Sequence, residues 1–148
     1  KISASPAITP EAWQLSMVQA GVPLITTPVV DAFVPQMLNF ESVDGVSFKK
    51  GCYPGQEVVA RSQFRGTLKR RMYRLASAAQ PQPGQEVFAA SDDSQPVGTV
   101  VQAAASASGF EALVSMQIAA ASEPLHLGSS TGAALQLLSL PYALKEDI

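Results

Sequence analysis

The sequence has little cysteine, histidine, tryptophan or charge: one residue of each of the first three types in 148, and 15% charged residues. One cysteine cannot form a disulfide within the chain, which is the usage expected in a reducing compartment. No apolar run approaches the roughly 20 residues that span a bilayer, and no basic-then-apolar leader is seen. We therefore expect a cytoplasmic protein without a membrane segment or a disulfide framework.

Several kinds of site are also missing from the sequence. His126 has no Cys, Asp or Glu partner at ligand spacing, so we expect no metal site. There is no phosphate-binding or dinucleotide-binding glycine pattern and no serine nucleophile elbow. An iron–sulfur cluster normally needs four cysteines, which this chain cannot supply alone. The sequence therefore gives no signal for these common metal, nucleotide or serine-nucleophile sites.

The second half of the sequence has the pattern of a small barrel. Short apolar segments separated by Gly, Ser and Pro turns predict strands at 68–76, 87–89, 98–103, 110–118 and 135–140. Several short strands at regular spacing are typical of an antiparallel β-barrel. We therefore predict an α+β fold, with residues 1–67 in one domain and residues 68–148 in the barrel.

The first half begins with a helix. Thr9 is placed as its N-cap and Pro10 at its first position, and Gly21 ends it. Trp13 and Met17 share one face of this helix, and periodicity alone predicts that Trp13 is a core anchor. Beyond the helix, residues 24–34 predict a short strand or extended segment, and residues 33–39 predict one helical turn.

Cys52 lies in a turn that presents its side chain rather than burying it. Gly51, Pro54 and Gly55 surround it, and a helix is predicted from Gln56 up to a stop at Gly66. The positive end of a helix and nearby lysines favour a thiolate. The pattern indicates a reactive thiol, and the alternative is a small apolar filler.

The same turn carries a family resemblance. The run K-G-C-Y-P-G-Q-E at residues 50–57 resembles the signature K-G-C-Y-x-G-Q-E of the YgfZ family of folate-binding proteins, relatives of the glycine-cleavage aminomethyltransferases that act in iron–sulfur enzyme maintenance. Recognisable pattern extends over about residues 10–75, and the remainder fits the family's C-terminal barrel loosely. The resemblance implies that an N-terminal half of the same parent chain forms most of the folate pocket.

The resemblance also implies a folate site that takes tetrahydrofolate or a derivative. Trp13 is in the place of a tryptophan that lies against the folate, and Gln19 replaces a glutamate that contacts folate in the aminomethyltransferases. An amide cannot supply a carboxylate's charge, which argues against ordinary aminomethyl transfer. We assign catalytic roles to Cys52 and Lys50. The other predicted folate-binding residues are Tyr53, Gln56, Glu57, Arg61, Arg65 and Lys69.

Positive charge is concentrated in one run. The net charge is −2, yet eight of the ten Lys and Arg residues lie between Lys49 and Arg74, where Glu57 is the only acid. Such an excess attracts polyanions, and the candidates are nucleic acid, phosphate and the carboxylate tail of a folate. The alternative is an amphipathic helix and a strand with solvated charges.

The sequence favours a folate-binding accessory protein that supports synthesis or repair of iron–sulfur enzymes, including tRNA-modifying ones. Its expected partners are folate, iron–sulfur proteins or their assembly factors. One alternative is a folate-dependent one-carbon transferase, so the sequence leaves open whether the protein is an enzyme. Another is a barrel that binds nucleic acid directly, for which only Tyr53, Phe64 and Tyr73 interleave with the basic residues.

Overall fold

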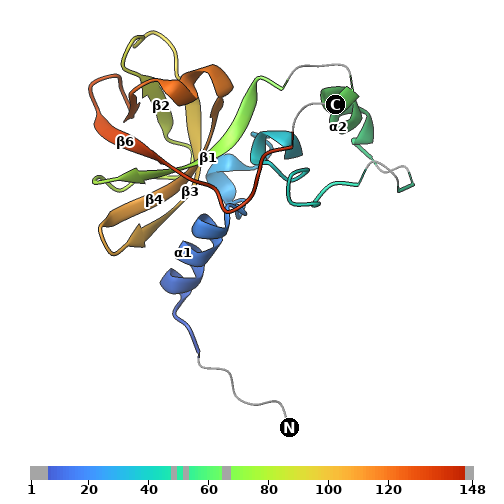
Figure 1. Cartoon of the computed structure of the whole chain (residues 1–148), viewed down its shortest axis with the longest axis horizontal. Helices are drawn as coiled ribbons and strands as arrows, with labels where there is room; N and C mark the ends of the chain where they lie inside the picture. Colours follow the sequence, from blue (N-terminus) through green and yellow to red (C-terminus); the bar gives the residue numbers. More distant parts are fainter. Residues whose placement is uncertain (1–6, 48–49, 52–53, 65–67, 146–148) are drawn as a thin grey trace.

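A closed six-stranded barrel forms most of the molecule (Figure 1). The computed structural model describes residues 7–47, 50–51, 54–64 and 68–145. The helices are α1 (Pro10–Ala20), α2 (Gln56–Phe64) and the 3₁₀ helices η1 (Thr27–Val29), η2 (Pro35–Leu38) and η3 (Ile118–Ser122). The strands are β1 (Arg70–Ser77), β2 (Glu86–Ala89), β3 (Gly98–Ser106), β4 (Gly109–Gln117), β5 (Leu125–Leu127) and β6 (Ala133–Leu138).

The barrel confirms the predicted α+β fold class. Its strands follow the spatial order β1-β4-β3-β2-β5-β6, and every neighbouring pair is antiparallel. Every second side chain along β4 points into the barrel and helps to fill it. Ala112, Val114 and Met116 of β4 belong to one core with Leu75 of β1 and Val100 of β3. Five of the six strands lie where the sequence predicts them, with ends that differ by a few residues.

Two segments differ from the prediction. The strand β5 was missed, because it has only three residues and His126 interrupts its apolar pattern, yet it closes the barrel between β2 and β6. Residues 24–34 contain η1 and no strand. Pro28 at the start of η1 has no N–H to give to a strand partner, and its fixed φ suits the first turn of a helix.

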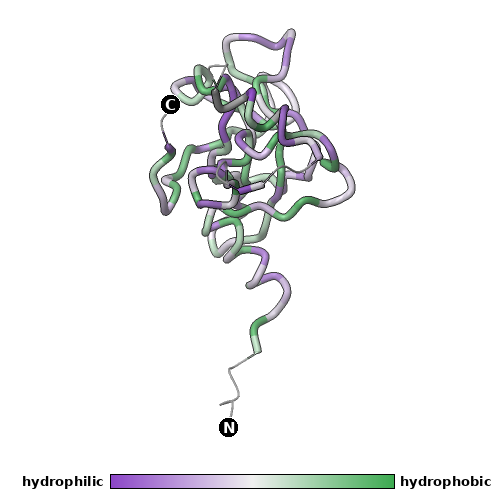
Figure 2. The backbone as a smooth tube through the Cα atoms, turned by 90° about the vertical axis from the view of Figure 1, so that its right-hand side faces the viewer, coloured by the Kyte–Doolittle hydropathy of each residue, from purple (hydrophilic) through white to green (hydrophobic). Residues whose placement is uncertain are grey.

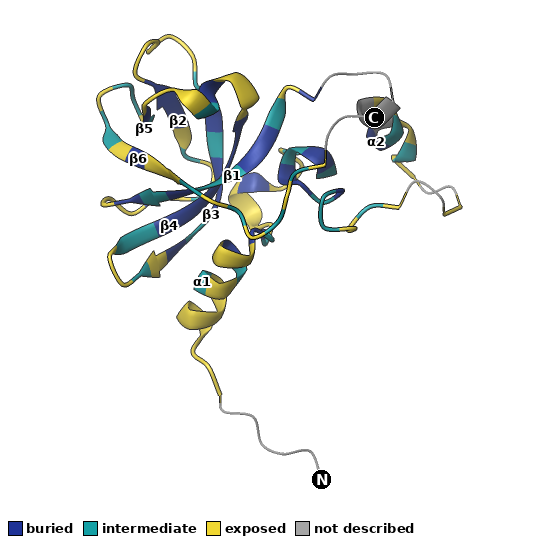
Figure 3. Ribbon diagram, viewed as in Figure 1, coloured by how far each residue is buried: buried dark blue, intermediate teal, exposed yellow. Residues whose placement is uncertain are grey.

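A second core lies outside the barrel wall. Val18 of α1 and Leu38 of η2 pack there against Met72, Val101 and Leu113 of the barrel. The register of β3 shifts between Val100 and Gln102, and this irregularity lets both Val101 and Gln102 be buried. Figure 3 shows buried residues gathered in the strands and η2, whereas most of α1 is exposed. The predicted division at residue 67 stays a prediction.

The helices that carry the predicted site leave the barrel in different directions. Figure 2 shows α1, with mixed hydrophilic and hydrophobic residues, extending beyond the barrel body. In Figure 1, α2 stands on another side of the barrel, near η2. Gln36 of η2 connects the two, since its Nε2 donates to the backbone oxygen of Val59 in α2 at 2.6 Å.

Candidate functional site

Trp13 lies on the face of α1 that points away from the barrel. The helix begins as predicted, with the Thr9 side chain accepting from the Ala12 N–H at 3.2 Å. Val18 is fully buried against the barrel, and Trp13 is five residues earlier, about 140° around the helix axis. Its side chain is 44% exposed. The core-anchor interpretation is therefore wrong, and the ring has a free face.

Gln19 is also exposed, but its amide group reaches the barrel wall. Its Nε2 donates to Glu111 Oε1 of β4 at 3.2 Å, and Arg74 Nε donates to the other oxygen of Glu111 at 2.8 Å. Gln19 and Trp13 are six residues apart, about 120° around the helix. The amide of Gln19 is thus already engaged in holding α1 on β4, and it does not share a face with Trp13.

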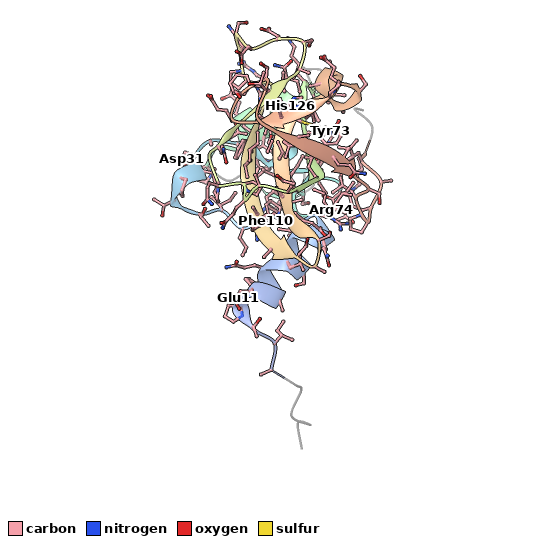
Figure 4. The ribbon with its side chains drawn as sticks, turned by 90° about the vertical axis from the view of Figure 1, so that its left-hand side faces the viewer. Glu11, Asp31, Tyr73, Arg74, Phe110 and His126 are labelled. Atoms are coloured by element: carbon pink, nitrogen blue, oxygen red, sulfur yellow. The ribbon has the colours of Figure 1, made fainter. Side chains whose placement is uncertain are left out.

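A cavity of about 230 Å³ lies on the barrel side of α1. Figure 4 shows two of its lining residues, Glu11 on α1 and Phe110 at the neighbouring end of the barrel. The remaining lining comes from Gln14, the loop 80–83 and three alanines of β3. None of the predicted site residues that the structure describes lines it. An acidic residue at position 11 has a structural explanation, because its negative charge interacts favourably with the dipole of α1 in the first turn.

The motif precedes α2 as predicted. Gly55 has φ +82°, a conformation that glycine adopts easily, and α2 begins at the next residue, Gln56. Lys50 is exposed. Cys52 lies outside the described residues, as do two other predicted site residues, Tyr53 and Arg65.

The α2 side of the site is open to solvent. Glu57 and Arg61 form an exposed ion pair one helical turn apart, with 3.7 Å between Arg61 Nη2 and Glu57 Oε1. Gln56 is partly buried, and Lys69, just before β1, is exposed. Arg61 and Lys69 are therefore accessible to an anionic ligand.

Two arginines of the basic run form ion pairs within the molecule. Arg71 is buried in an ion pair with Glu41, and Arg74 pairs with Glu111, with side chains 19% and 12% exposed. Both acids lie outside the run in sequence. The run therefore presents less positive charge to solvent than the excess near +7 that the sequence alone suggests.

The predicted site residues form two groups in the described part of the chain. Trp13 and Gln19 belong to α1, whereas Lys50, Gln56, Glu57 and Arg61 belong to the motif and α2, on another side of the barrel (Figure 1). One compact pocket that contains both groups is not seen among the described residues. A ligand that contacts both groups must be long.

Sequence reasoning missed a cluster of buried polar residues just before the motif. Gln36 and Asn39 are fully buried, and Glu41 is 4% exposed. A sign of this cluster was present in the sequence, because these polar residues are interspersed with the apolar residues Met37, Leu38 and Phe40. A polar residue inside an apolar stretch is buried only with hydrogen-bond partners, and these partners lie far away in the sequence.

The described residues also limit two other kinds of site. They contain no group of three or more His, Cys, Asp or Glu side chains that could hold a metal ion. None of the helices within the described ranges is long and apolar enough to cross a membrane.

These features define an α+β protein in which a small closed antiparallel barrel carries helices on its outer wall and a cysteine motif ahead of α2. Comparison with curated proteins finds relatives of this chain. Proteins called tRNA-modifying protein YgfZ match it from Sodalis glossinidius (36% identity over 140 residues) and Serratia proteamaculans (36% over 141 residues). The protein of that name from Yersinia enterocolitica is 35% identical over 141 residues.

The matches cover 90–91% of this chain and 42% of each of these relatives. The resemblance to the YgfZ family is therefore confirmed: the chain is homologous to these proteins over about nine-tenths of its length. It spans less than half of their length, a share that fits the expected C-terminal portion. No family model matches the chain.

Proposed function

We propose that this chain is part of a folate-binding accessory protein that supports iron–sulfur enzymes, including enzymes that modify tRNA. The observation that carries the proposal is the unbroken motif at residues 50–57 in a chain homologous to proteins named as tRNA-modifying. The exposed position of Trp13 supports a stacking role for its ring. The cofactor is tetrahydrofolate or a derivative.

In this proposal the predicted site residues have three separate roles. The pterin ring stacks on Trp13, and Arg61, Arg65 and Lys69 hold the glutamate tail by charge. Cys52, which stands four residues before α2 and two after Lys50 in the sequence, reacts as a thiolate in a thiol, persulfide or cluster-linked step. The two-sided placement of the site suits a long ligand, with the pterin and the tail at different places.

Calorimetric titration of tetrahydrofolate into the full-length protein tests the proposal. Trp13→Ala is expected to weaken binding at least about fivefold, since stacking on an aromatic ring is worth about 1–3 kcal/mol. Ile25→Ala is the matched control, because Ile25 is also exposed, at 45% against 44% for Trp13. Absence of binding to folded wild-type protein would remove the folate role.

The tail contact has its own test. Neutralising Arg61, Arg65 and Lys69 to Gln is expected to abolish a preference for polyglutamylated over monoglutamyl folate, while affinity for the monoglutamate stays close to that of the wild type. Glu57→Gln, which frees Arg61 from its ion pair, is expected to leave that preference intact or increase it. A preference unchanged by loss of all three cations would contradict the assignment.

A one-carbon transferase is the second candidate. The engagement of Gln19 with Glu111 weighs against it, because the position that would bear a carboxylate holds an amide already bonded to the barrel. Formation of product from an aminomethyl donor and tetrahydrofolate by the full-length protein would decide in its favour.

A further inference from the structure

Three buried polar residues just before the motif bond two other elements, α2 and β1. Gln36 binds the Val59 carbonyl of α2 at 2.6 Å. Asn39 binds β1 twice: its Oδ1 accepts from the Met72 N–H at 3.1 Å, and its Nδ2 donates to the Met72 carbonyl at 2.7 Å. Glu41 forms an ion pair with the buried Arg71 of β1. We call Gln36, Asn39 and Glu41 the polar hub.

The chain after β6, residues 139–145, returns to the same place, and we call it the C-terminal strap. The Tyr142 hydroxyl accepts from Asn39 Nδ2 at 3.4 Å and donates to the Gly21 carbonyl at 2.7 Å. The Lys145 N–H donates to Ser42 Oγ at 3.0 Å. The strap therefore binds both the polar hub and the residue that follows it.

The end of the strap is held from two further sides. Lys145 Nζ lies 2.6 Å from Asp44 Oδ1, and the Lys145 carbonyl accepts from Arg71 Nη2 at 2.5 Å. Arg71 thus joins Glu41 of the polar hub to the strap. Because Arg71 and Glu41 are both buried, this junction has one preferred geometry.

The strap also fits closely against the end of α1. Gly21 has φ +67°, and a Cβ added to it would lie 2.8 Å from Tyr142 Cε1 and 2.9 Å from Leu140 Cδ2. Such distances are shorter than normal contacts, so only glycine fits beneath the strap. Tyr142 is therefore seated between α1 and the polar hub.

The motif lies between two points that the polar hub fixes. On one side, Gly45 comes four residues after Glu41, and its N–H donates to the Phe40 carbonyl at 2.7 Å. On the other side, Val59 of α2 is bound by Gln36. The ends of the segment from Gly45 to Val59, which contains the motif, are thus set by the same six residues, 36–41.

We propose that the polar hub and the C-terminal strap are positioning elements for the motif: they set the place of α2, and of the motif residues 54–57 at its start, relative to the barrel. Loss of a strap contact then loosens α2 and changes the surroundings of Cys52, although the strap is about 90 residues away in sequence. The inference rests on the proposed function only for the role given to Cys52 and folate; the coupling itself is a property of the fold.

Hydrogen exchange and thiol alkylation in the full-length protein test this coupling. Tyr142→Phe keeps the ring and removes the hydroxyl, and Lys145→Ala removes the ammonium group. Tyr142→Phe is expected to speed exchange of the α2 amides about fivefold, the effect of losing one ordinary hydrogen bond, and to change the alkylation rate of Cys52 by iodoacetamide. Lys145→Ala breaks an exposed ion pair, with side chains 54% and 89% exposed, and is expected to have a smaller effect in the same direction. Exchange in β2 and β3 is expected to stay at the wild-type rate.

Tyr73→Phe and Lys69→Ala are the matched controls, because Tyr73 is a partly buried tyrosine and Lys69 an exposed lysine outside the strap. Both controls are expected to leave α2 unchanged. Unchanged α2 exchange in both strap variants would overturn the inference. Faster exchange spread evenly over the barrel would also overturn it, since that result indicates general destabilisation.

The outcome is separate from the test of folate binding. If tetrahydrofolate does not bind but the strap variants loosen α2, the positioning role stands and the proposed function fails. If tetrahydrofolate binds and α2 is indifferent to the strap, the proposed function stands and the positioning role fails.

Discussion

At the scale of single residues, the positive charges illustrate what a sequence hides. The sequence places Arg71 and Arg74 in one basic run, yet Glu41 and Glu111, which neutralise them, are 30 and 37 positions away. Only the closed barrel and the segment packed on it bring these pairs together. The N-cap Thr9 shows the opposite case, since its partner Ala12 is three residues away and local rules predict it.

The buried pair is expected to matter far more than the exposed one. Glu41→Gln leaves Arg71 buried without its carboxylate partner, which costs about 3–5 kcal/mol. Glu57→Gln breaks the pair with Arg61, whose side chains are 68% and 87% exposed, and is expected to change stability little. Urea denaturation of the two variants measures the difference. Similar midpoints would contradict the structural role given to Glu41.

Tyr142 makes the strap sensitive to alkaline pH. Burial raises the pKa of Tyr142 above its ordinary value of 10.0, although the Asn39 hydrogen bond and the nearby Arg71 act in the opposite direction. A raised pKa means that the folded state favours the neutral phenol. The stabilisation is complete below pH 10 and is lost as the pH rises through the folded-state pKa.

We therefore expect α2 to loosen in wild-type protein as the pH rises above 10, when ionised Tyr142 can no longer donate to the Gly21 carbonyl. Absorbance near 295 nm follows the ionisation, and a fluorophore attached to α2 follows the loosening. Burial also raises the pKa of Tyr73, so Tyr73→Phe serves as the control. A loosening that persists in Tyr142→Phe would assign it to another group.

At the scale of elements, local patterns predicted most of the architecture. The strand β4 was predicted because apolar residues alternate along it, and α1 and α2 because capping residues and glycines mark their ends. The strand β5 was missed because three residues are too few to show an alternating pattern. It forms because it pairs with β2 on one side and β6 on the other. Tertiary pairing therefore decides the short elements.

The attachment of α1 to β4 is expected to depend on an amide at position 19. Gln19→Glu places a second carboxylate beside Glu111, in the last turn of α1 where the helix dipole is also negative. The introduced carboxyl acquires a raised pKa in the folded state, so stability falls as the pH rises from 4 to 7. Thermal unfolding at both pH values measures this.

Adding Glu111→Gln to that variant removes the repulsion but leaves Arg74 with one partner fewer. The pH dependence is expected to return toward that of the wild type in the double variant. A pH dependence unchanged by the second substitution would show that Glu111 is not the cause.

At the scale of the whole molecule, the second core joins α1 and η2 to the barrel. Val18 and Leu38 from the first half share that core with Met72, Val101 and Leu113 of the barrel. Among the described residues, α1 and η2 are thus packed on the barrel wall. A division near residue 67 follows the change in sequence character, and the packing crosses it.

We expect α1 and the barrel to unfold in one transition. Val18→Ala in α1 and Val114→Ala in the barrel interior are both expected to lower the midpoint of that transition, by removing fully buried methyl groups. Fluorescence of Trp13 reports on α1, and far-ultraviolet circular dichroism reports on the strands. Separate transitions by the two probes would establish independent units.

Asn39 has a further consequence for the solubility of the molecule. The pairing of β6 with β1 begins at Arg74, so the backbone groups of Met72 on that side are not covered by β6. The amide of Asn39 covers them in place of a strand. An uncovered stretch of strand is a template for pairing with another chain. One side chain thus completes the barrel rim, and Asn39→Ala is expected to promote self-association.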